Sequence, residues 1–218
     1  MVSTQLDGPA NLERRPSLPR VRSANALKDA AGQELGTNVL SNVEWVRNLY
    51  NEPEIELLAT CGAMSQPNKS ISVDPDHLFL SMLRQRLIAD ICFMYNREKQ
   101  IFHTLVSLGP DVAGHPRVTH GGFTSAVIDE TTGGLVYELK KSGCLGPGPA
   151  FTAHLEVDFK KPLPVNINVI CTAWVTSMEG RKCWTAAEMR DEPGGTIFAT
   201  GKALYVTPRQ AAETEPKT

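Results

Sequence analysis

A His-Gly-Gly triplet followed by an acidic residue is the part of the chain whose residue types could do chemistry. His120, Gly121 and Gly122 open a long stretch without proline, and Asp129 stands eight residues after Gly121. The first backbone N–H groups of a helix have no partner within the helix and lie at its positive end, and glycine lets a ligand approach them closely. They could stabilise the oxyanion that forms on a carbonyl during acyl transfer, while the Asp129 carboxylate could activate water or attack directly.

Other reactive side chains nearby are weaker candidates for catalysis. Glu130 points about 100° away from Asp129 around a helix and is expected to be a structural partner. An imidazole just before a helix is expected to hold the turn by hydrogen bonds, so His120 is not taken as a base. Ser125 is not in a Gly-x-Ser-x-Gly turn, which argues against an α/β-hydrolase, and Cys144 lies in a loop without a helix dipole of its own.

The composition argues against several classes of protein. The chain has 218 residues and a net charge of −2, so it lacks the general basic footprint of a nucleic-acid-binding protein. A run of about 18 apolar residues is missing, and we expect neither a membrane span nor a secretory signal. Five cysteines without a Cys-x-x-Cys pair and five dispersed histidines argue against a disulfide scaffold and a metal site, and no cofactor is expected. We expect a cytoplasmic protein; four arginines among the first 22 residues leave a mitochondrial location open.

The two ends of the chain and its first third are predicted to lie outside the main domain. Residues 1–38 and 208–218 are predicted to be disordered tails, because they contain few large apolar residues. The segment 39–86 is predicted to be an extension of helix and loop. Ser41 is predicted to cap a helix over 42–50, with Glu44 at the capping-box position and up to two further turns after Pro53. Residues 65–76 are predicted to be a loop, and 77–86 are open between helix and loop.

Residues 87–207 are predicted to form one domain of strands around a single helix. Segments 87–95 and 100–108 flank the polar residues NREK and predict a hairpin, and 122–140 predicts the helix. Strict alternation of apolar and polar residues predicts a strand over 151–160. Three further strands are predicted over 166–177, 181–190 and 196–206. Antiparallel strands with one helix on one face make an α+β fold, and the sheet must curl around the helix to bury it.

The motifs in this domain resemble those of the hotdog-fold acyl-CoA thioesterases. The pattern His-Gly-Gly-x6-Asp-Glu, followed by FTAHLEVDFKKPLP, is most similar to the phenylacetyl-CoA thioesterase-like branch, its mitochondrial relatives and fungal members. The resemblance covers about residues 85–207 and implies an antiparallel sheet wrapped around one long central helix. Many members carry an asparagine or glutamine where this chain has Gly114.

The resemblance also implies roles for individual residues. Gly121 would offer its N–H to the thioester carbonyl, Asp129 would be the catalytic carboxylate, and Thr152 would orient the attacking water. Further substrate contacts are expected from the N-terminus of the helix and from the basic residues after the following strand, where the family often meets the CoA phosphates: His120, Gly122, Lys160 and Lys161.

We therefore expect an enzyme that hydrolyses an acyl-CoA to a free acid and CoA. Release of an acyl or polyketide chain from a carrier protein, hydration or dehydration on the same fold, and a catalytically silent acyl-CoA-binding module are the alternatives. Gly121 and Asp129 lie about 12 Å apart along a helix axis, although both must reach one thioester carbon. The site is therefore predicted to lie between two antiparallel copies of the helix, in a homodimer or a dimer of dimers.

Overall fold

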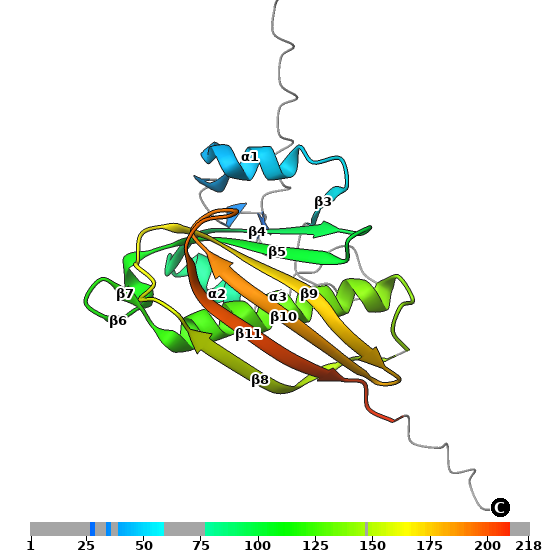
Figure 1. Ribbon diagram of the computed structural model, residues 1–218. Helices are drawn as coiled ribbons and strands as arrows, with labels where there is room; N and C mark the ends of the chain where they lie inside the picture. The colour runs from blue at the N-terminus through cyan, green and yellow to red at the C-terminus, as the bar shows by residue number, and fades with distance from the viewer. Residues whose placement is uncertain (1–26, 29–33, 36–38, 59–76, 147, 210–218) are drawn as a thin grey trace, which may run out of the picture.

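A curved antiparallel sheet of seven strands packs around one long helix, α3 (Gly121–Lys141), as Figure 1 shows. The structure is a computed structural model that describes residues 27–28, 34–35, 39–58, 77–146 and 148–209. The strands follow the order β3 (Ile55–Leu58), β4 (Ile88–Asn96), β5 (Ile101–Leu108), β9 (Asn168–Glu179), β10 (Lys182–Arg190), β11 (Ile197–Val206) and β8 (Phe151–Phe159). The predicted α+β hotdog arrangement, a sheet wrapped around one central helix, is confirmed.

The strands and the long helix lie close to their predicted bounds. The hairpin of β4 and β5, the helix α3 and the four later strands each begin and end within a few residues of the prediction. A short ladder of β6 (Ala113–His115) and β7 (Val118–Thr119), after the 3-10 turn η3 (Pro110–Val112), precedes α3 and was not predicted. Of the predicted C-terminal tail, residues 210–218 lie outside the described residues.

Close approach between α3 and the sheet explains why the helix contains glycine. A Cβ atom at Gly134 would lie 2.6 Å from the ring of Phe102, so no larger residue fits there. Across the helix, a Cβ atom at Gly201 on β11 would lie 2.5 Å from Ile128. The face of α3 between these contacts is fully buried, and its apolar members are Val127, Ile128, Leu135 and Leu139. Burial of this face stabilises the domain through the hydrophobic effect.

The N-terminal extension differs from its prediction at two points. Helix α1 (Glu44–Tyr50) is present, but its N-cap is Val43, without a side-chain hydrogen bond, because Ser41 lies inside a preceding 3-10 turn, η1 (Val39–Asn42). The predicted capping box of Ser41 and Glu44 is therefore wrong. After Pro53 the chain forms the strand β3 instead of further helix, because Ile55–Leu58 pairs with the end of β4.

The remaining N-terminal predictions are only partly described. The segment 77–86, for which the sequence does not decide between helix and loop, contains the helix α2 (Leu78–Arg84). Within the predicted tail 1–38, the structure describes only β1 (Leu27–Lys28) and β2 (Glu34–Leu35), which pair with each other. The rest of that tail and the predicted loop 65–76 lie outside the described residues.

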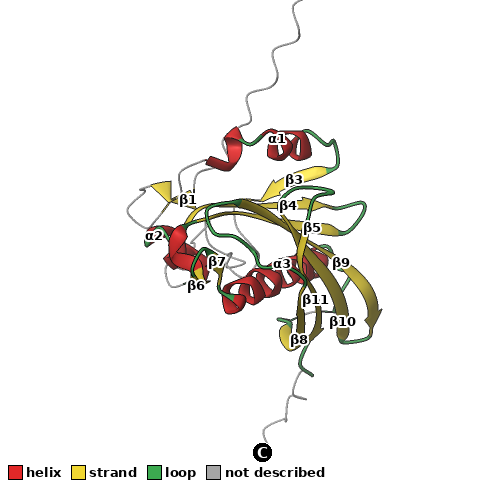
Figure 2. Cartoon of the chain, turned by 60° about the vertical axis from the view of Figure 1, so that its left-hand side comes forward, coloured by secondary structure: helices red, strands yellow, loops and turns green. Residues whose placement is uncertain are grey.

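The first part of the extension, η1 and α1, covers the face of the sheet opposite α3, as Figure 2 shows for α1. Leu40, Val46 and Leu49 pack against residues of β4, β5 and β9 that alternate with the residues facing α3. Both faces of these strands are therefore buried, which accounts for the nearly continuous apolar sequence of β4. The carboxylate of Asp90 on β4 accepts hydrogen bonds from the Leu40 and Ile91 N–H groups at 3.1 and 2.9 Å.

Candidate active site

The N-terminus of α3 holds the His-Gly-Gly triplet in a defined turn. His120 is the N-cap residue, and its Nδ1 accepts a hydrogen bond from the Gly122 N–H at 2.9 Å. The imidazole therefore holds the turn and occupies the Gly122 N–H, which is then not available to a carbonyl. Among the described residues nothing accepts from the Gly121 N–H, and the ring of Phe159 lies beside it, 3.3 Å from where a Cβ atom would stand.

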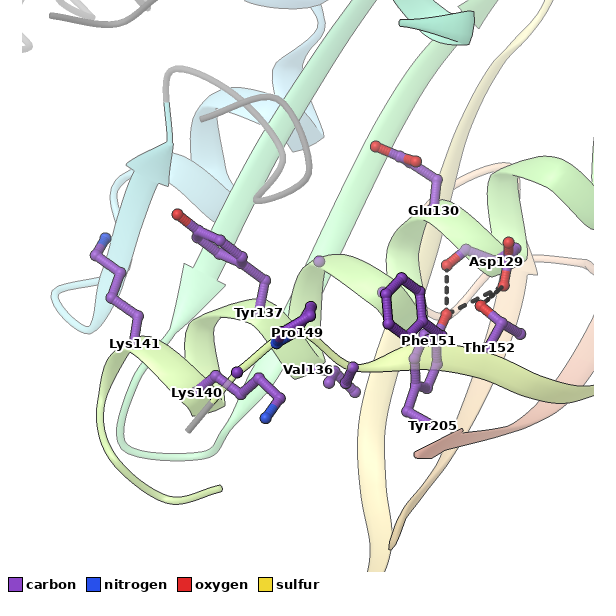
Figure 3. A pocket seen from close by; sticks show the side chains of 14 residues that line it. Asp129, Glu130, Val136, Tyr137, Lys140, Lys141, Pro149, Phe151, Thr152 and Tyr205 are labelled. Carbon is purple, nitrogen blue, oxygen red and sulfur yellow. Dashed lines mark hydrogen bonds between the residues drawn. The ribbon is translucent and has the colours of Figure 1, made fainter. Parts of the chain in front are cut away.

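Two turns further along α3, the half-buried Asp129 is held by two hydroxyl groups. Its Oδ1 accepts hydrogen bonds from Thr152 Oγ1 at 3.0 Å and from Tyr205 Oη at 3.1 Å (Figure 3). The Tyr205 hydroxyl also lies 2.9 Å from the Asp129 carbonyl oxygen and 3.0 Å from Thr132 Oγ1. Within the described part of the chain no donor is bonded to Asp129 Oδ2. One carboxylate oxygen is thus fixed, and the other is open to a water molecule or a substrate carbon.

A β-bulge turns Thr152 toward Asp129. Leu155 and Val157 on β8 face the core, so strict alternation would place Thr152 on the outer face. In the structure Leu204 pairs with His154 and Tyr205 pairs with Thr152, which leaves Ala153 as an extra residue. The extra residue reverses the alternation, so that Thr152 and Tyr205 face α3 together.

Tyr205 is a site residue that the sequence analysis missed. Burial, followed by the nearby Asp129 charge, raises the pKa of the Tyr205 hydroxyl well above its usual range, so it stays protonated and can donate. A signal was available in β11, where Ala199, Gly201 and Ala203 alternate as buried small residues and Tyr205 is next in phase. A large polar side chain at the end of a row of small residues that face a helix is a candidate partner for that helix.

An open pocket of about 800 Å³ extends from Asp129 along α3. One wall is the helix face that carries Gly133, Val136 and Tyr137, and the other is formed by residues 148–152 and Tyr205. Figure 3 shows the side chains of Lys140 and Lys141 at the end opposite Asp129. The Lys140 Nζ donates to the Gly146 carbonyl at 2.6 Å, and Lys141 lies 3.4 Å from Glu138. The pocket is therefore apolar in its middle and cationic at its far end.

The predicted site residues separate into two groups at opposite ends of β8. Asp129, Thr152 and Tyr205 form what we call the Asp129 half-site, beside the beginning of β8. The Gly121 half-site, Gly121 and Phe159, lies beside its end. The predicted substrate contacts Lys160 and Lys161 follow Phe159 and are not among the residues that line the pocket. Their N–H groups both donate to the Phe198 carbonyl, and the Lys160 ammonium lies 3.1 Å from Asp158.

Glu130 and other polar side chains outside the two half-sites have structural partners. The Glu130 carboxylate lies 3.7 Å from His77 Nε2, and Figure 3 shows it directed away from Thr152 and Tyr205. His103 Nδ1 lies 2.9 Å from Thr172 Oγ1. In the described ranges no three His, Cys, Asp or Glu side chains gather in a way that could hold a metal ion. No helix of the described residues is long and apolar enough to cross a membrane.

Comparison with known families gives a match that covers α3 and most of the sheet after it. Residues 117–198 match the family model of the thioesterase superfamily. They form a thioesterase superfamily domain. The resemblance to thioesterases that the His-Gly-Gly and Asp129 motif carries is thereby confirmed at the level of the superfamily, and both half-sites except Tyr205 lie within the matched residues of the thioesterase domain.

Curated relatives and solved structures each resemble part of the chain. The chain is 34% identical to acyl-coenzyme A thioesterase THEM4 of Xenopus laevis over 118 residues, which are 54% of this chain and 50% of that protein. It is 26% identical to THEM4 of Mus musculus over 128 residues, or 59% of this chain and 52% of that protein. The chain thus spans about half the length of the curated relatives it matches. A solved thioesterase superfamily protein is similar with a TM-score of 0.46 and 22% identity, over 54% of this chain and 53% of that one.

Proposed function

We propose that this protein hydrolyses an acyl-CoA thioester to a free acid and CoA, at a site built by two copies of the chain. The observation that carries the proposal is the Asp129 carboxylate, which two hydroxyls hold through Oδ1 at one end of a largely apolar pocket while Oδ2 stays open. The thioesterase domain and the relatives named acyl-coenzyme A thioesterases support this choice of reaction.

The chemistry needs a base or nucleophile and a group that stabilises an oxyanion. As a base, Asp129 Oδ2 takes a proton from water while the water oxygen bonds to the thioester carbon. The carbonyl oxygen becomes an oxyanion that accepts from the Gly121 N–H, then the C–S bond breaks and the CoA thiolate takes the proton from Asp129. As a nucleophile, Asp129 would instead expel the thiolate and form an anhydride that water then hydrolyses. Thr152 fixes the carboxylate in either case.

The separation of the two half-sites supports a site shared by two chains. Gly121 and Asp129 are about 12 Å apart along α3, whereas a reacting carbon must lie about 3 Å from both groups. Two copies of α3 that run antiparallel would bring the Gly121 half-site of one chain to the Asp129 half-site of the other. Two composite sites related by a two-fold axis would result.

The free edge of the sheet supports the same arrangement. β8 is the last strand of the sheet, and most of its side chains are exposed, including Phe151 and Phe159 at 58% each. A long exposed edge strand with apolar side chains is a surface that proteins usually cover. If two β8 strands pair antiparallel, the beginning of each lies beside the end of the other. The pairing would therefore join unlike half-sites in the same way as the antiparallel helices.

The test of the reaction is free-thiol release from a panel of acyl-CoAs, from acetyl to palmitoyl, with an aromatic thioester included. Asp129→Asn keeps the shape of the side chain but can act neither as base nor as nucleophile, and we expect kcat to fall by about 10²- to 10⁴-fold. Asp111→Asn, the same change at an exposed residue of η3, is the matched control. A kcat for Asp129→Asn within about threefold of the wild type would reject the assignment. Acyl-CoA binding without thiol release by the wild type would indicate a binding module.

The shared site is tested by complementation between two inactive variants. Asp129→Asn removes one group, and Gly121→Pro removes the N–H at the first helical position, where proline is tolerated. Refolded together in equal amounts, half of the dimers should be mixed, and each mixed dimer has one intact site of two. Activity should recover to about a quarter of the wild type. No recovery, with mixed dimers demonstrated by mass spectrometry, would contradict a site shared between chains.

A further inference from the structure

Gly133 leaves an open space on the helix face that forms the wall of the pocket. Residues 129, 133, 136, 137 and 140 recur at helical spacing, so they share one face of α3, and all of them line the pocket. On this face Gly133 has no side chain, and it stands one turn after Asp129. Any substrate group that extends from the Asp129 carboxylate along α3 must therefore pass Gly133.

The packing of the domain does not require glycine at this position. Its neighbour Gly134 is required, because a Cβ atom there would meet the Phe102 ring at 2.6 Å. At Gly133 the nearest atom to a Cβ would be Tyr205 Oη at 3.3 Å, and the next would be 3.8 Å away. The contact is tight but involves one hydroxyl. Glycine also destabilises a helix interior relative to alanine, so the chain gives up stability at a position where a methyl group would press only on the Tyr205 hydroxyl.

We propose that Gly133 determines which acyl groups the pocket accepts. The acyl chain leaves the thioester carbon at Asp129, crosses the helix over Gly133 and lies against Val136 and Tyr137. This inference rests on the proposed function and adds the path and the class of the acyl group. A side chain at position 133 would fill the space that the chain needs immediately after its first carbons.

The ends of the pocket give the expected size of the acyl group. From Asp129 to Tyr137 the helix rises about 12 Å, roughly the extended length of a decanoyl chain. Beyond this point stand the Lys140 and Lys141 side chains, whose ammonium groups an alkyl end would have to desolvate. The geometry therefore favours acyl groups of medium length over palmitoyl.

The experiment compares Gly133→Ala and Gly133→Val with the wild type, with acetyl-CoA and decanoyl-CoA as substrates. Gly146→Val is the matched control, because nothing lies within 4 Å of a Cβ atom there and the residue does not line the pocket. We expect the ratio of kcat/KM for decanoyl-CoA to that for acetyl-CoA to fall at least tenfold in Gly133→Val, mainly through KM. Gly133→Ala should give a smaller fall, and Gly146→Val should leave the ratio within twofold of the wild type. Thermal unfolding checks that each variant is folded.

Two outcomes would overturn the inference. An equal loss for both substrates would mean that the new side chain acts through Tyr205 and Asp129, and an unchanged ratio would mean that the acyl chain runs elsewhere. The same comparison is made for binding, by calorimetric titration of both acyl-CoAs into folded Asp129→Asn with and without Gly133→Val. A selective loss of decanoyl-CoA affinity supports the path over Gly133 even if the wild type hydrolyses nothing, which would reject only the proposed reaction. If decanoyl-CoA binds equally well to Asp129→Asn with and without Gly133→Val, the path of the acyl chain over Gly133 is rejected.

Discussion

Tyr205→Phe is the most direct test of how Asp129 is held. The change removes one hydroxyl and keeps the ring that fills the space between β11 and α3. The lost contact that bears on the carboxylate is the hydrogen bond of 3.1 Å to Asp129 Oδ1, and the contacts to the Asp129 carbonyl oxygen and to Thr132 Oγ1 are lost with it. A hydrogen bond to a charged group contributes about 1.5–3 kcal/mol. If that whole contribution stabilises the transition state and not the bound substrate, its removal lowers the rate roughly 10- to 150-fold. Because Thr152 still holds the same oxygen, we expect the lower end, about a tenfold fall in kcat.

The assay for Tyr205→Phe is steady-state thiol release together with thermal unfolding. We expect KM to stay within about threefold and the free energy of unfolding to fall by about 1 kcal/mol, the usual contribution of one buried hydrogen bond. Tyr95→Phe is the matched control, because Tyr95 is 1% exposed and lies on β4, and it does not line the pocket. A kcat within twofold of the wild type would refute the idea that Tyr205 positions the carboxylate. A rise in KM alone would make Tyr205 only a wall of the pocket.

Three further predictions concern the second hydroxyl and two partly buried titratable groups. Thr152→Val should also lower kcat about tenfold, and the double variant with Tyr205→Phe should lose more than the product of the two, measured by thiol release. Burial lowers the pKa of His103 to about 4, so as the pH falls from 6.5 toward 4 the free energy of unfolding should lose up to about 3 kcal/mol. His103→Gln should flatten this dependence in denaturant titrations; an unchanged slope would contradict it. Burial raises the pKa of the Asp90 carboxyl in the folded state, so the stability that its neutral form contributes is lost as the pH rises through that pKa. Because asparagine is neutral at every pH, Asp90→Asn should not lower the melting temperature at pH 8.

The central part of the fold could be predicted because its patterns are periodic over many residues. The helix α3 lies within a long stretch without proline, 117–146, and the sequence of β8 alternates apolar and polar residues over its whole length. The extension could not be predicted as well, because its elements are short and depend on partners elsewhere. Ile55–Leu58 is a strand because it pairs with the end of β4, and Ser41 fails as a cap because the chain already turns at η1.

The site was predictable only where the motif itself carries the residues. Asp129 and Gly121 lie on one helix, so their spacing shows that they are too far apart for one carbon. Tyr205 is 76 residues from Asp129, and only the register of β11 against β8 brings it there. The Gly122 N–H looked equivalent to that of Gly121 in the sequence, but the His120 imidazole occupies it. Such competition between a side chain and a ligand is visible only in three dimensions.

The bulge at Ala153 means that the catalytic geometry depends on a residue count as well as on residue types. If β8 kept all its residues but paired without the bulge, Ala153 would lie opposite Tyr205 and the Thr152 hydroxyl would rotate to the outside of the sheet, although every residue of the motif would remain. In a related chain that lacks this one residue the strand would be regular, and a hydroxyl immediately before the residue equivalent to His154 would hold the same carboxylate. A one-residue gap at position 153 of an alignment is therefore compatible with a working site, whereas a threonine at position 152 of a strand that keeps position 153 and pairs regularly faces away from the carboxylate.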